Sequence, residues 1–201
     1  MLHSVRDYLS KFGKPDEKIL AMIDKVDRKD FMIENLELAY EDEAVPIGYQ
    51  QTISQPSTVA RMISLLELKK SDTILEIGTG SLWNAAVMAQ LSKKVTTLEI
   101  VNEFIERAEN IIKRLKIKNI EVKNMDFRKV DEKFNKIIFT AGISKNEEDT
   151  IEEFAKNHLK ENGILLCPYR SGQLIVMKKQ KSSIIKIYTK DEYGFVPLIL
   201  D

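Results

Sequence analysis

The stretch from Thr73 to Glu99 limits the possible folds more than any other part of the sequence. It begins with a β-prone run, Thr73 to Ile77, which ends at a glycine-containing turn. Apolar residues then recur at helical spacing from Leu82 to Leu91, and a second β-prone run extends from Val95 to Leu98. This order predicts a parallel strand, helix, strand unit and places the chain in the α/β class.

The turn in this unit is suited to a nucleotide-like ligand. Gly78 and Gly80 let the backbone turn sharply and approach a ligand closely, and the following helix offers unpaired N–H groups. Glu99 lies about 20 residues beyond the turn, where doubly wound folds place a carboxylate for ribose hydroxyls. The dinucleotide pattern G-x-G-x-x-G fails, because Trp83 takes the place of its third glycine. A purely structural turn between strand and helix remains the alternative.

The turn and the acid together form a more specific pattern, E-x-G-x-G from Glu76 to Gly80 followed by Glu99. This pattern resembles the first two motifs of S-adenosylmethionine-dependent methyltransferases. The usual third glycine of that motif is replaced by Leu82, which we expect to reshape the methionine end of the pocket. The resemblance implies that these positions bind S-adenosylmethionine: Gly78, Thr79, Gly80, Ser81, Glu99 and Ile100.

Composition and charge narrow the classes of partner. The 201 residues suffice for one well-buried domain, and Lys plus Arg and Asp plus Glu are both 31. A chain without net charge has no long-range attraction for nucleic acid or an anionic membrane, so we expect neither as a partner. No apolar run approaches the roughly 18 residues of a membrane helix, and charges interrupt the N-terminal stretch where a signal peptide would be apolar. We therefore expect a cytoplasmic protein.

Cysteine and histidine are too sparse for a metal cluster or a disulfide. Cys167 is the only cysteine, and it lies in the apolar run Ile164 to Pro168, which is typical of a buried core residue. The two histidines, His3 and His158, are too far apart in sequence for a histidine metal motif. We expect no metal site.

A proline-flanked segment precedes the glycine turn. It reads PIGYQQTISQPSTVARM from Pro46 to Met62, and the prolines place its hydroxyl-rich centre, Thr52 to Ser54, in an extended or looped stretch. An amphipathic helix is predicted after Pro56. On physical grounds alone, Thr and Ser before a helix can simply cap it.

This segment is similar to the signature of protein-L-isoaspartate O-methyltransferases, typically P-I-G-x-G-Q-T-I-S-x-P followed by a helix with an Ala-Arg-Met-like turn. The chain also ends with YGFVPLIL, Tyr193 to Leu200, similar to the terminal V-P-L element of that family. The resemblance extends from about Lys25 to the end of the chain. It implies methyl transfer from S-adenosylmethionine to the free carboxylate of L-isoaspartyl residues in damaged proteins and peptides, with S-adenosylhomocysteine as the product.

The resemblance also implies roles for further residues. Ser54 is expected to be the catalytic hydroxyl, which would donate a hydrogen bond to the substrate carboxylate. Asp126 and Phe127 stand where the family usually has G-D-G, and we expect them near the adenine, in a looser or differently shaped loop because the glycines are missing. The remaining cofactor residues are expected to be Gln51, Thr52 and Ile53, and the other substrate residues to be Val196, Pro197 and Leu198.

Several positions depart from the family pattern. Gln50 replaces a glycine, Leu82 and Trp83 replace a glycine and an aromatic residue, and Ser57 stands where many members have histidine or tyrosine. These departures leave open two alternatives to the repair enzyme. One is a catalytically impaired relative that binds S-adenosylmethionine or nothing; the other is a methyltransferase acting on RNA or a small molecule.

The rest of the chain fits a doubly wound, Rossmann-like sheet in a single domain, residues 1–201. Residues 1–45 are expected to form a helical N-terminal cap without strands, and residues 46–201 the core. Helices are predicted for Asn102 to Leu115 and Glu147 to Leu159, with Asn162 and Gly163 as the stop signal of the latter. Further strands are predicted for Ile120 to Lys123, Lys136 to Thr140, Ile164 to Cys167, Gln173 to Lys178 and Ile184 to Tyr188, the last two as a hairpin.

Overall fold

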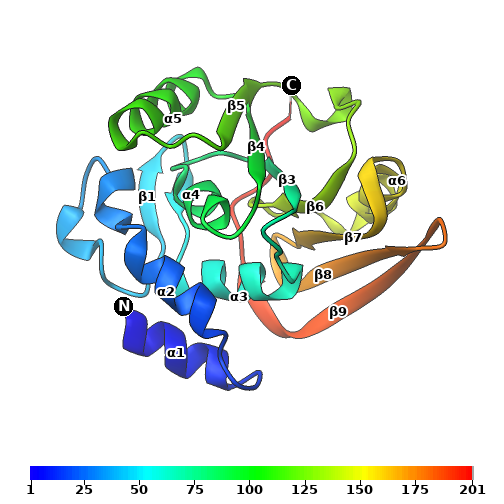
Figure 1. Cartoon of the computed structure of the whole chain (residues 1–201), viewed down its shortest axis with the longest axis horizontal. Coiled ribbons are helices and arrows are strands. Elements are labelled where there is room, and N and C mark those ends of the chain that lie inside the picture. The colour runs from blue at the N-terminus through cyan, green and yellow to red at the C-terminus, as the bar shows by residue number, and fades with distance from the viewer. Residues whose placement is uncertain (201) are drawn as a thin grey trace.

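A computed structural model describes residues 1–200 and contains a central sheet of seven strands in the order β5-β4-β3-β6-β7-β8-β9 (Figure 1). The strands from β5 to β7 are parallel, and β8 and β9 complete the sheet as antiparallel neighbours. Their bounds are β3 Thr73–Ile77, β4 Lys94–Glu99, β5 Ile120–Asn124, β6 Phe134–Phe139, β7 Leu159–Pro168, β8 Ser171–Gln180 and β9 Ser183–Gly194. This is the predicted Rossmann-like α/β sheet.

The strand order reverses beside β3. From β3 the chain moves outward through β4 to β5, and it then returns to the other side of β3 as β6. Both neighbours run parallel to β3, with Ile77 opposite Leu98 on one side and Phe139 on the other. In open α/β sheets the crevice at such a reversal, outside the carboxyl ends of the strands, is where ligands bind.

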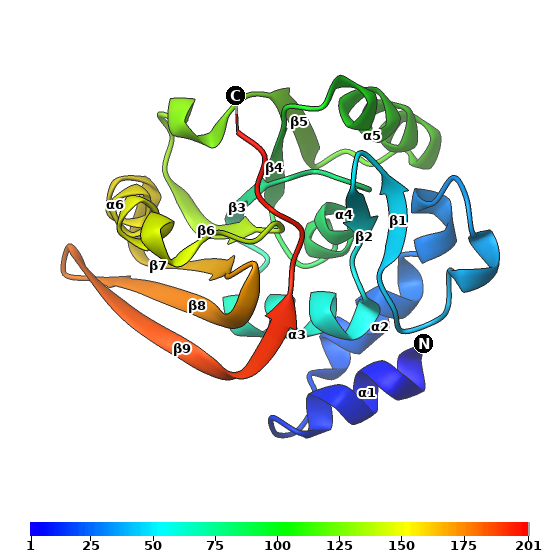
Figure 2. The ribbon, with the colours of Figure 1, turned by 180° about the vertical axis from the view of Figure 1, so that it is seen from behind.

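Helices cover both faces of the sheet. The helices α3 Pro56–Leu66, α4 Trp83–Ala89 and α5 Asn102–Leu115 pack on one face, and α6 Glu148–His158 packs on the other (Figures 1 and 2). Side chains alternate along β6 accordingly: Ile138 joins the first core cluster, while Ile137 and Phe139 join the second with Phe154 of α6. The double covering explains why the central strands are apolar on both faces.

The N-terminal part is helical at first and then irregular. It contains α1 Leu2–Ser10 and α2 Glu17–Lys25, followed by the single 3₁₀ turns η1 Arg28–Phe31 and η2 Leu36–Leu38. A short hairpin, β1 Val45–Gly48 and β2 Gln51–Ile53, then leads into α3. The extended conformation predicted for the segment around Thr52 is therefore confirmed, and the first strand begins at Val45, the last residue of the predicted cap.

The helix predicted for Glu147 to Leu159 is confirmed as α6, but the interpretation of Asn162 and Gly163 as its stop signal is wrong, because both lie inside β7. The helix ends at His158, and β7 begins at the next residue, pairing Leu159 with Phe134. The pairing register then shifts before Ile164, and Asn162 adopts a left-handed φ of 61° inside this irregular stretch. The same residue types that end a helix thus make a bulge in a strand. The predicted hairpin is confirmed as β8 and β9, joined at Lys181 and Ser182.

Two short 3₁₀ turns, η3 Phe127–Lys129 and η4 Lys145–Glu147, complete the described elements. No helix within residues 1–200 is long and apolar enough to cross a membrane. No cluster of His, Cys, Asp and Glu suited to a metal ion occurs among the same residues.

Candidate active site

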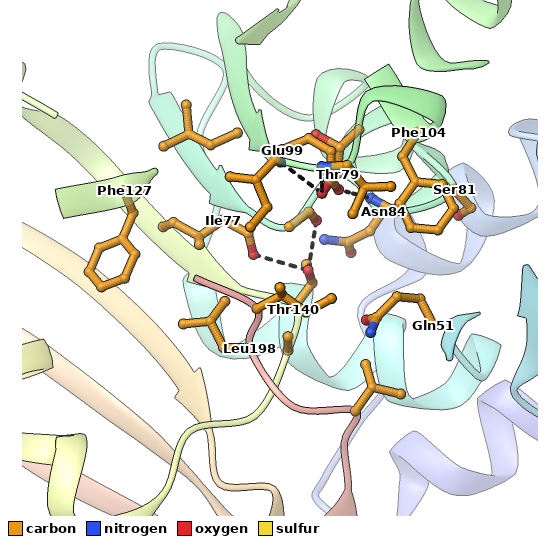
Figure 3. A pocket seen from close by; sticks show the side chains of 18 of the residues that line it. Gln51, Ile77, Thr79, Ser81, Asn84, Glu99, Phe104, Phe127, Thr140 and Leu198 are labelled. Carbon is orange, nitrogen blue, oxygen red and sulfur yellow. Dashed lines mark hydrogen bonds between the residues drawn. The ribbon is translucent and has the colours of Figure 1, made fainter. Parts of the chain in front are cut away.

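A cleft lies at the strand-order reversal, where β3, β4 and β6 end (Figure 3). It holds about 870 Å³ of space between atoms, open solvent included. Its walls come from β2 and the turn after it, from the loops after β3, β4, β5 and β6, and from the C-terminal segment after β9, which runs past the ends of the other strands (Figure 2).

The floor of the cleft is the turn after β3, and glycine is required there. Gly78 has a φ of +96°, and a Cβ on it would lie 2.4 Å from Oγ1 of Thr140. That hydroxyl belongs to the end of β6 and donates to the carbonyls of Ile77 at 3.0 Å and Gly78 at 2.7 Å (Figure 3). Thr140 therefore fastens the ends of β3 and β6 together, and only glycine leaves room for it.

Glu99 closes one side of the cleft. Its Oε2 accepts a hydrogen bond from the N–H of Gly80 at 3.0 Å, and its Oε1 accepts from the N–H groups of Ile100 at 2.9 Å and Val101 at 3.1 Å. The residue is only 8% exposed. A carboxylate oxygen can accept more than one hydrogen bond, so Glu99 is held in place by the backbone and can still accept from ligand hydroxyls.

A network of buried polar side chains connects β3, β4 and α4 beside the glycine turn. Glu76 accepts hydrogen bonds from Asn84 Nδ2 at 2.7 Å and Thr97 Oγ1 at 2.6 Å, and the Thr97 hydroxyl also pairs with that of Thr79 at 2.8 Å. Burial raises the pKa of Glu76 to about 8, against the opposing effect of these two donors. The other amide atom of the Asn84 side chain, Oδ1, is buried at the cleft without a protein partner among the described residues.

Ser54 faces this floor from the turn between β2 and α3. It lines the same cleft as Gly78 and Gly80. Beside it, the C-terminal segment contributes Val196 to Leu198. This segment is held at the end of β6, because the N–H of Gly142 donates to the carbonyl of Val196 at 2.8 Å and the carbonyl of Gly142 accepts from the N–H of Leu198 at 3.0 Å.

The family model of protein-L-isoaspartate(D-aspartate) O-methyltransferase matches residues 4–200. This chain belongs to that family. A protein-L-isoaspartate O-methyltransferase of Dictyoglomus turgidum is 38% identical over 201 residues, which cover 97% of this chain and 89% of the relative. One of Aliivibrio fischeri is 37% identical over 209 residues and covers 99% of this chain and 98% of its own length.

Solved structures agree with this assignment. A protein-L-isoaspartate O-methyltransferase matches with a TM-score of 0.82 at 26% identity, covering 98% of this chain and 65% of the other. A proposed protein-L-isoaspartate O-methyltransferase of Plasmodium falciparum, solved in complex with S-adenosyl-L-homocysteine, matches with a TM-score of 0.78 at 26% identity, covering 98% of this chain and 97% of the other.

Almost all residues that the sequence proposed for the site lie around this one cleft, and Ile53 does not. Ile53 is 1% exposed and packs in the core, so it can support the Ser54 turn but not contact a ligand in the cleft. The proposed residues that line the cleft are Gln51, Thr52, Ser54, Gly78, Thr79, Gly80, Ser81, Glu99, Ile100, Asp126, Phe127, Val196, Pro197 and Leu198.

Asp126 and Phe127 form the far wall of the cleft. The carboxylate of Asp126 is 2% exposed and accepts from the Arg128 backbone N–H and from its guanidinium, at 2.6 to 2.8 Å. Phe127 packs edge-to-face on Phe139 and Phe154, with ring centroids 5.2 and 5.1 Å away. These contacts anchor the 3₁₀ turn η3, and no glycine flanks Asp126.

The two departures after the glycine turn differ in their consequences. Leu82 keeps a left-handed backbone, with φ 72°, but its side chain is fully buried in the core and does not line the cleft. The expectation that its side chain reshapes the pocket therefore finds no support in the lining. Trp83 does line the cleft, and its Nε1 donates to the carbonyl of Val26 at 3.0 Å, which ties α4 to the N-terminal cap.

Sequence reasoning missed several residues that line the cleft. The most informative are Asn84, Phe104 and Thr140, which stand in the first turns of α4 and α5 and directly after β6. Only their position in the sequence could have identified them, because residues just beyond the carboxyl ends of parallel strands meet at one end of the sheet. No motif singled them out.

Proposed function

We propose that this chain is a protein-L-isoaspartate O-methyltransferase that acts through Ser54 and the glycine turn. It transfers the methyl group of S-adenosylmethionine to the free carboxylate of L-isoaspartyl residues in damaged proteins and peptides, the first step of their repair. The observation that carries the assignment of the site is that Ser54 and the turn from Gly78 to Ser81 line the same cleft.

The residues of the cleft fit the cofactor. Gly78 and Gly80 bring bare backbone to the floor, where a Cβ at position 78 would collide with Thr140. Glu99 is fixed by three backbone N–H groups and is positioned to accept from ribose hydroxyls. When bound, S-adenosylmethionine supplies an electrophilic methyl group and leaves as S-adenosylhomocysteine.

The protein's contribution is positioning rather than proton transfer. A carboxylate with a pKa near 4 is already ionised at neutral pH and needs no general base. Consistently, the described lining of the cleft contains no histidine. We assign to Ser54 a hydrogen bond that orients the carboxylate, and to the backbone of Val196 to Leu198 the recognition of the displaced main chain. Positioning of this kind can lower a barrier by several kcal/mol.

A paired-substrate assay tests the proposal. The full chain is incubated with methyl-labelled S-adenosylmethionine and either an isoaspartyl peptide or its normal aspartyl twin. We expect base-labile label only in the isoaspartyl peptide and little in Ser54→Ala, whereas Ser64→Ala, a serine whose hydroxyl bonds within α3, keeps the activity. Equal labelling of both peptides, or none, would reject the repair function. Cofactor binding without labelling would identify the catalytically impaired alternative.

Two further expectations belong to the same proposal. The balanced charges favour a peptide over a nucleic acid as the substrate. We also propose a cytoplasmic location, where the single cysteine, Cys167, stays a buried thiol. Fractionation of cells that express the full chain, followed by the peptide assay on each fraction, tests the location.

A further inference from the structure

Arg28 of η1 is a fully buried cation that contacts the catalytic turn. The residue is 0% exposed. The four N–H groups of its two Nη atoms are shared among six backbone carbonyls from two segments, residues 38–43 and residues 53–54. Nη1 donates to those of Leu38 at 3.3 Å, Ala39 at 3.2 Å and Glu41 at 3.4 Å, and Nη2 to those of Glu43 at 2.8 Å, Ile53 at 3.4 Å and Ser54 at 3.2 Å.

Burying the charge of Arg28 costs free energy, and the packing of its side chain alone does not explain why a charged residue stands here. Desolvation lowers the pKa of Arg28 to about 10, against the opposing charges of Asp42 and Glu43, so the group is still protonated at neutral pH. Its Nε atom has no hydrogen-bond partner among the described residues. An apolar side chain of similar size is often at least as stabilising in such a place, so the arginine has to be explained by what its donors hold.

The guanidinium of Arg28 contacts three structures, of which the Ser54 turn and α4 contribute to the cleft lining. One is the loop of residues 38–43, whose Asp42 carboxylate accepts from the N–H of Ser57 at 2.8 Å and thereby holds the first turn of α3. The second is the turn containing Ser54. The third is α4, because the guanidinium carbon lies 5.5 Å from the ring centre of Trp83, a residue of the cleft wall.

We propose that Arg28 is a positioning residue that fixes the Ser54 turn relative to the cofactor cleft by holding the carbonyls of Ile53 and Ser54. The inference rests on the proposed function of Ser54. Because the fork-shaped guanidinium holds these two carbonyls, it restricts the backbone that carries the Ser54 hydroxyl. A lysine ammonium cannot reach both segments with the same geometry, because it is a single point charge on a flexible stem.

Kinetics and cofactor binding of Arg28→Met and Arg28→Lys test this role. We expect kcat for an isoaspartyl peptide to fall by about tenfold or more in Arg28→Met, with a smaller loss in Arg28→Lys, because small displacements of a reacting group are costly. The affinity for S-adenosylhomocysteine is expected to stay within about threefold, because Gly80 and Glu99 are held independently of Arg28. Hydrogen exchange at residues 54–57 should accelerate in Arg28→Lys.

A cap variant separates positioning from loss of stability. Ile23→Ala removes a fully buried side chain of α2 that belongs to the same core, and it should lower Tm yet keep kcat at a temperature where the protein is folded. A folded Arg28→Lys with wild-type kcat and unchanged exchange at residues 54–57 would overturn the proposal, as would a loss of S-adenosylhomocysteine affinity parallel to that of kcat. An inactive wild-type chain would instead refute the proposed function itself, and this inference with it.

Discussion

Glu99 at the end of β4 accepts a hydrogen bond from the backbone N–H of Gly80, in the turn after β3, over 3.0 Å. The two motifs that the sequence offers separately, a glycine turn and a distant acid, are thus joined before any ligand is bound. Ile100 and Val101 donate to the other carboxylate oxygen. The orientation of Glu99 is therefore set by the protein, and a ribose would meet an acceptor already in place.

Replacement of Glu99 should weaken cofactor binding. Hydrogen bonds to a charged group contribute about 1.5 to 3 kcal/mol, so we expect Glu99→Ala to reduce the affinity for S-adenosylhomocysteine by about tenfold or more. Isothermal titration calorimetry measures this directly. Glu103→Ala removes an equal charge from an exposed position of α5 outside the cleft lining and serves as the control. An affinity for Glu99→Ala within twofold of the wild type would remove Glu99 from the site.

The buried carboxyl of Glu76 should make stability depend on pH. Its pKa is about 8 in the folded chain, against 4.5 for an unperturbed group, so between these values unfolding releases a proton. The contribution of the Glu76 carboxyl to the free energy of unfolding is fully present below pH 4.5 and is lost as the pH rises through 8. The loss is at most about 1.4 kcal/mol per pH unit. Glu76→Gln cannot ionise and should therefore gain stability relative to the wild type as the pH rises from 5 to 8.

Urea unfolding at several pH values checks this expectation. The quantity of interest is the free energy of unfolding of Glu76→Gln minus that of the wild type, followed across the pH range. The exposed Glu109→Gln on α5 provides a control whose difference from the wild type should stay flat. A flat difference for Glu76→Gln as well would mean that Glu76 is already ionised in the folded state at pH 5.

The sequence predicted the parts of the site that depend on local chemistry. The glycine turn, the acid Glu99 and the extended Ser54 segment follow from residue type and spacing, and the structure brings them to one cleft. Contacts made across long stretches of chain were not predictable in this way. Thr140 reaches Gly78 from 62 residues away, and Arg28 reaches Ser54 from 26 residues away. Nothing in the neighbourhood of either residue in the sequence indicates its partner.

The prediction at Asn162 and Gly163 failed for a related reason. Both residue types favour helix ends and strand bulges alike, and the choice between them is made by the neighbouring strand. A Cβ on Gly163 would lie 2.9 Å from the carbonyl oxygen of Asn135 in β6, so the glycine is needed where β7 meets that strand. Tertiary packing thus determined whether Asn162 and Gly163 end a helix or form a bulge in a strand.

Substitutions of Leu82 compare the stabilisation from its buried side chain with the strain of its left-handed backbone. A left-handed conformation costs a leucine roughly 1 to 2 kcal/mol, whereas truncation of a buried leucine to alanine costs about 2 to 5 kcal/mol. We therefore expect both Leu82→Ala and Leu82→Gly to be less stable than the wild type. Glycine relieves the strain that alanine keeps, so Leu82→Gly should be at least as stable as Leu82→Ala. Urea unfolding of both variants measures the order.

The opposite order would contradict the observed backbone at this position. Inside regular structure, a protein with alanine is normally about 0.5 to 1 kcal/mol more stable than the same protein with glycine. A more stable Leu82→Ala would therefore indicate an ordinary helical φ at this position. The affinity for S-adenosylhomocysteine should change little in either variant, because the Leu82 side chain lies outside the cleft lining.

Gly142 connects the end of β6 to the C-terminal segment and leaves no room for a side chain. A Cβ there would lie 2.6 Å from Cα and 2.7 Å from N of Arg170, and backbone atoms cannot swing aside as a side chain can. Gly142→Ala must therefore displace either Arg170 or the pairing with Val196 and Leu198. Because that pairing places the proposed substrate-binding backbone, we expect kcat/KM for an isoaspartyl peptide to fall by about tenfold or more.

The comparison with Gly194→Ala shows whether the displaced pairing is the cause. Gly194 stands just before the same segment, but a Cβ on it would meet nothing within 4 Å, so this variant should retain kcat/KM. Steady-state kinetics of the two variants over a range of peptide concentrations also separates KM from kcat. If Gly142→Ala kept the wild-type kcat/KM while folded, the bridge to Val196 and Leu198 would not be what holds the substrate-binding segment, and its place beside Ser54 would need another anchor.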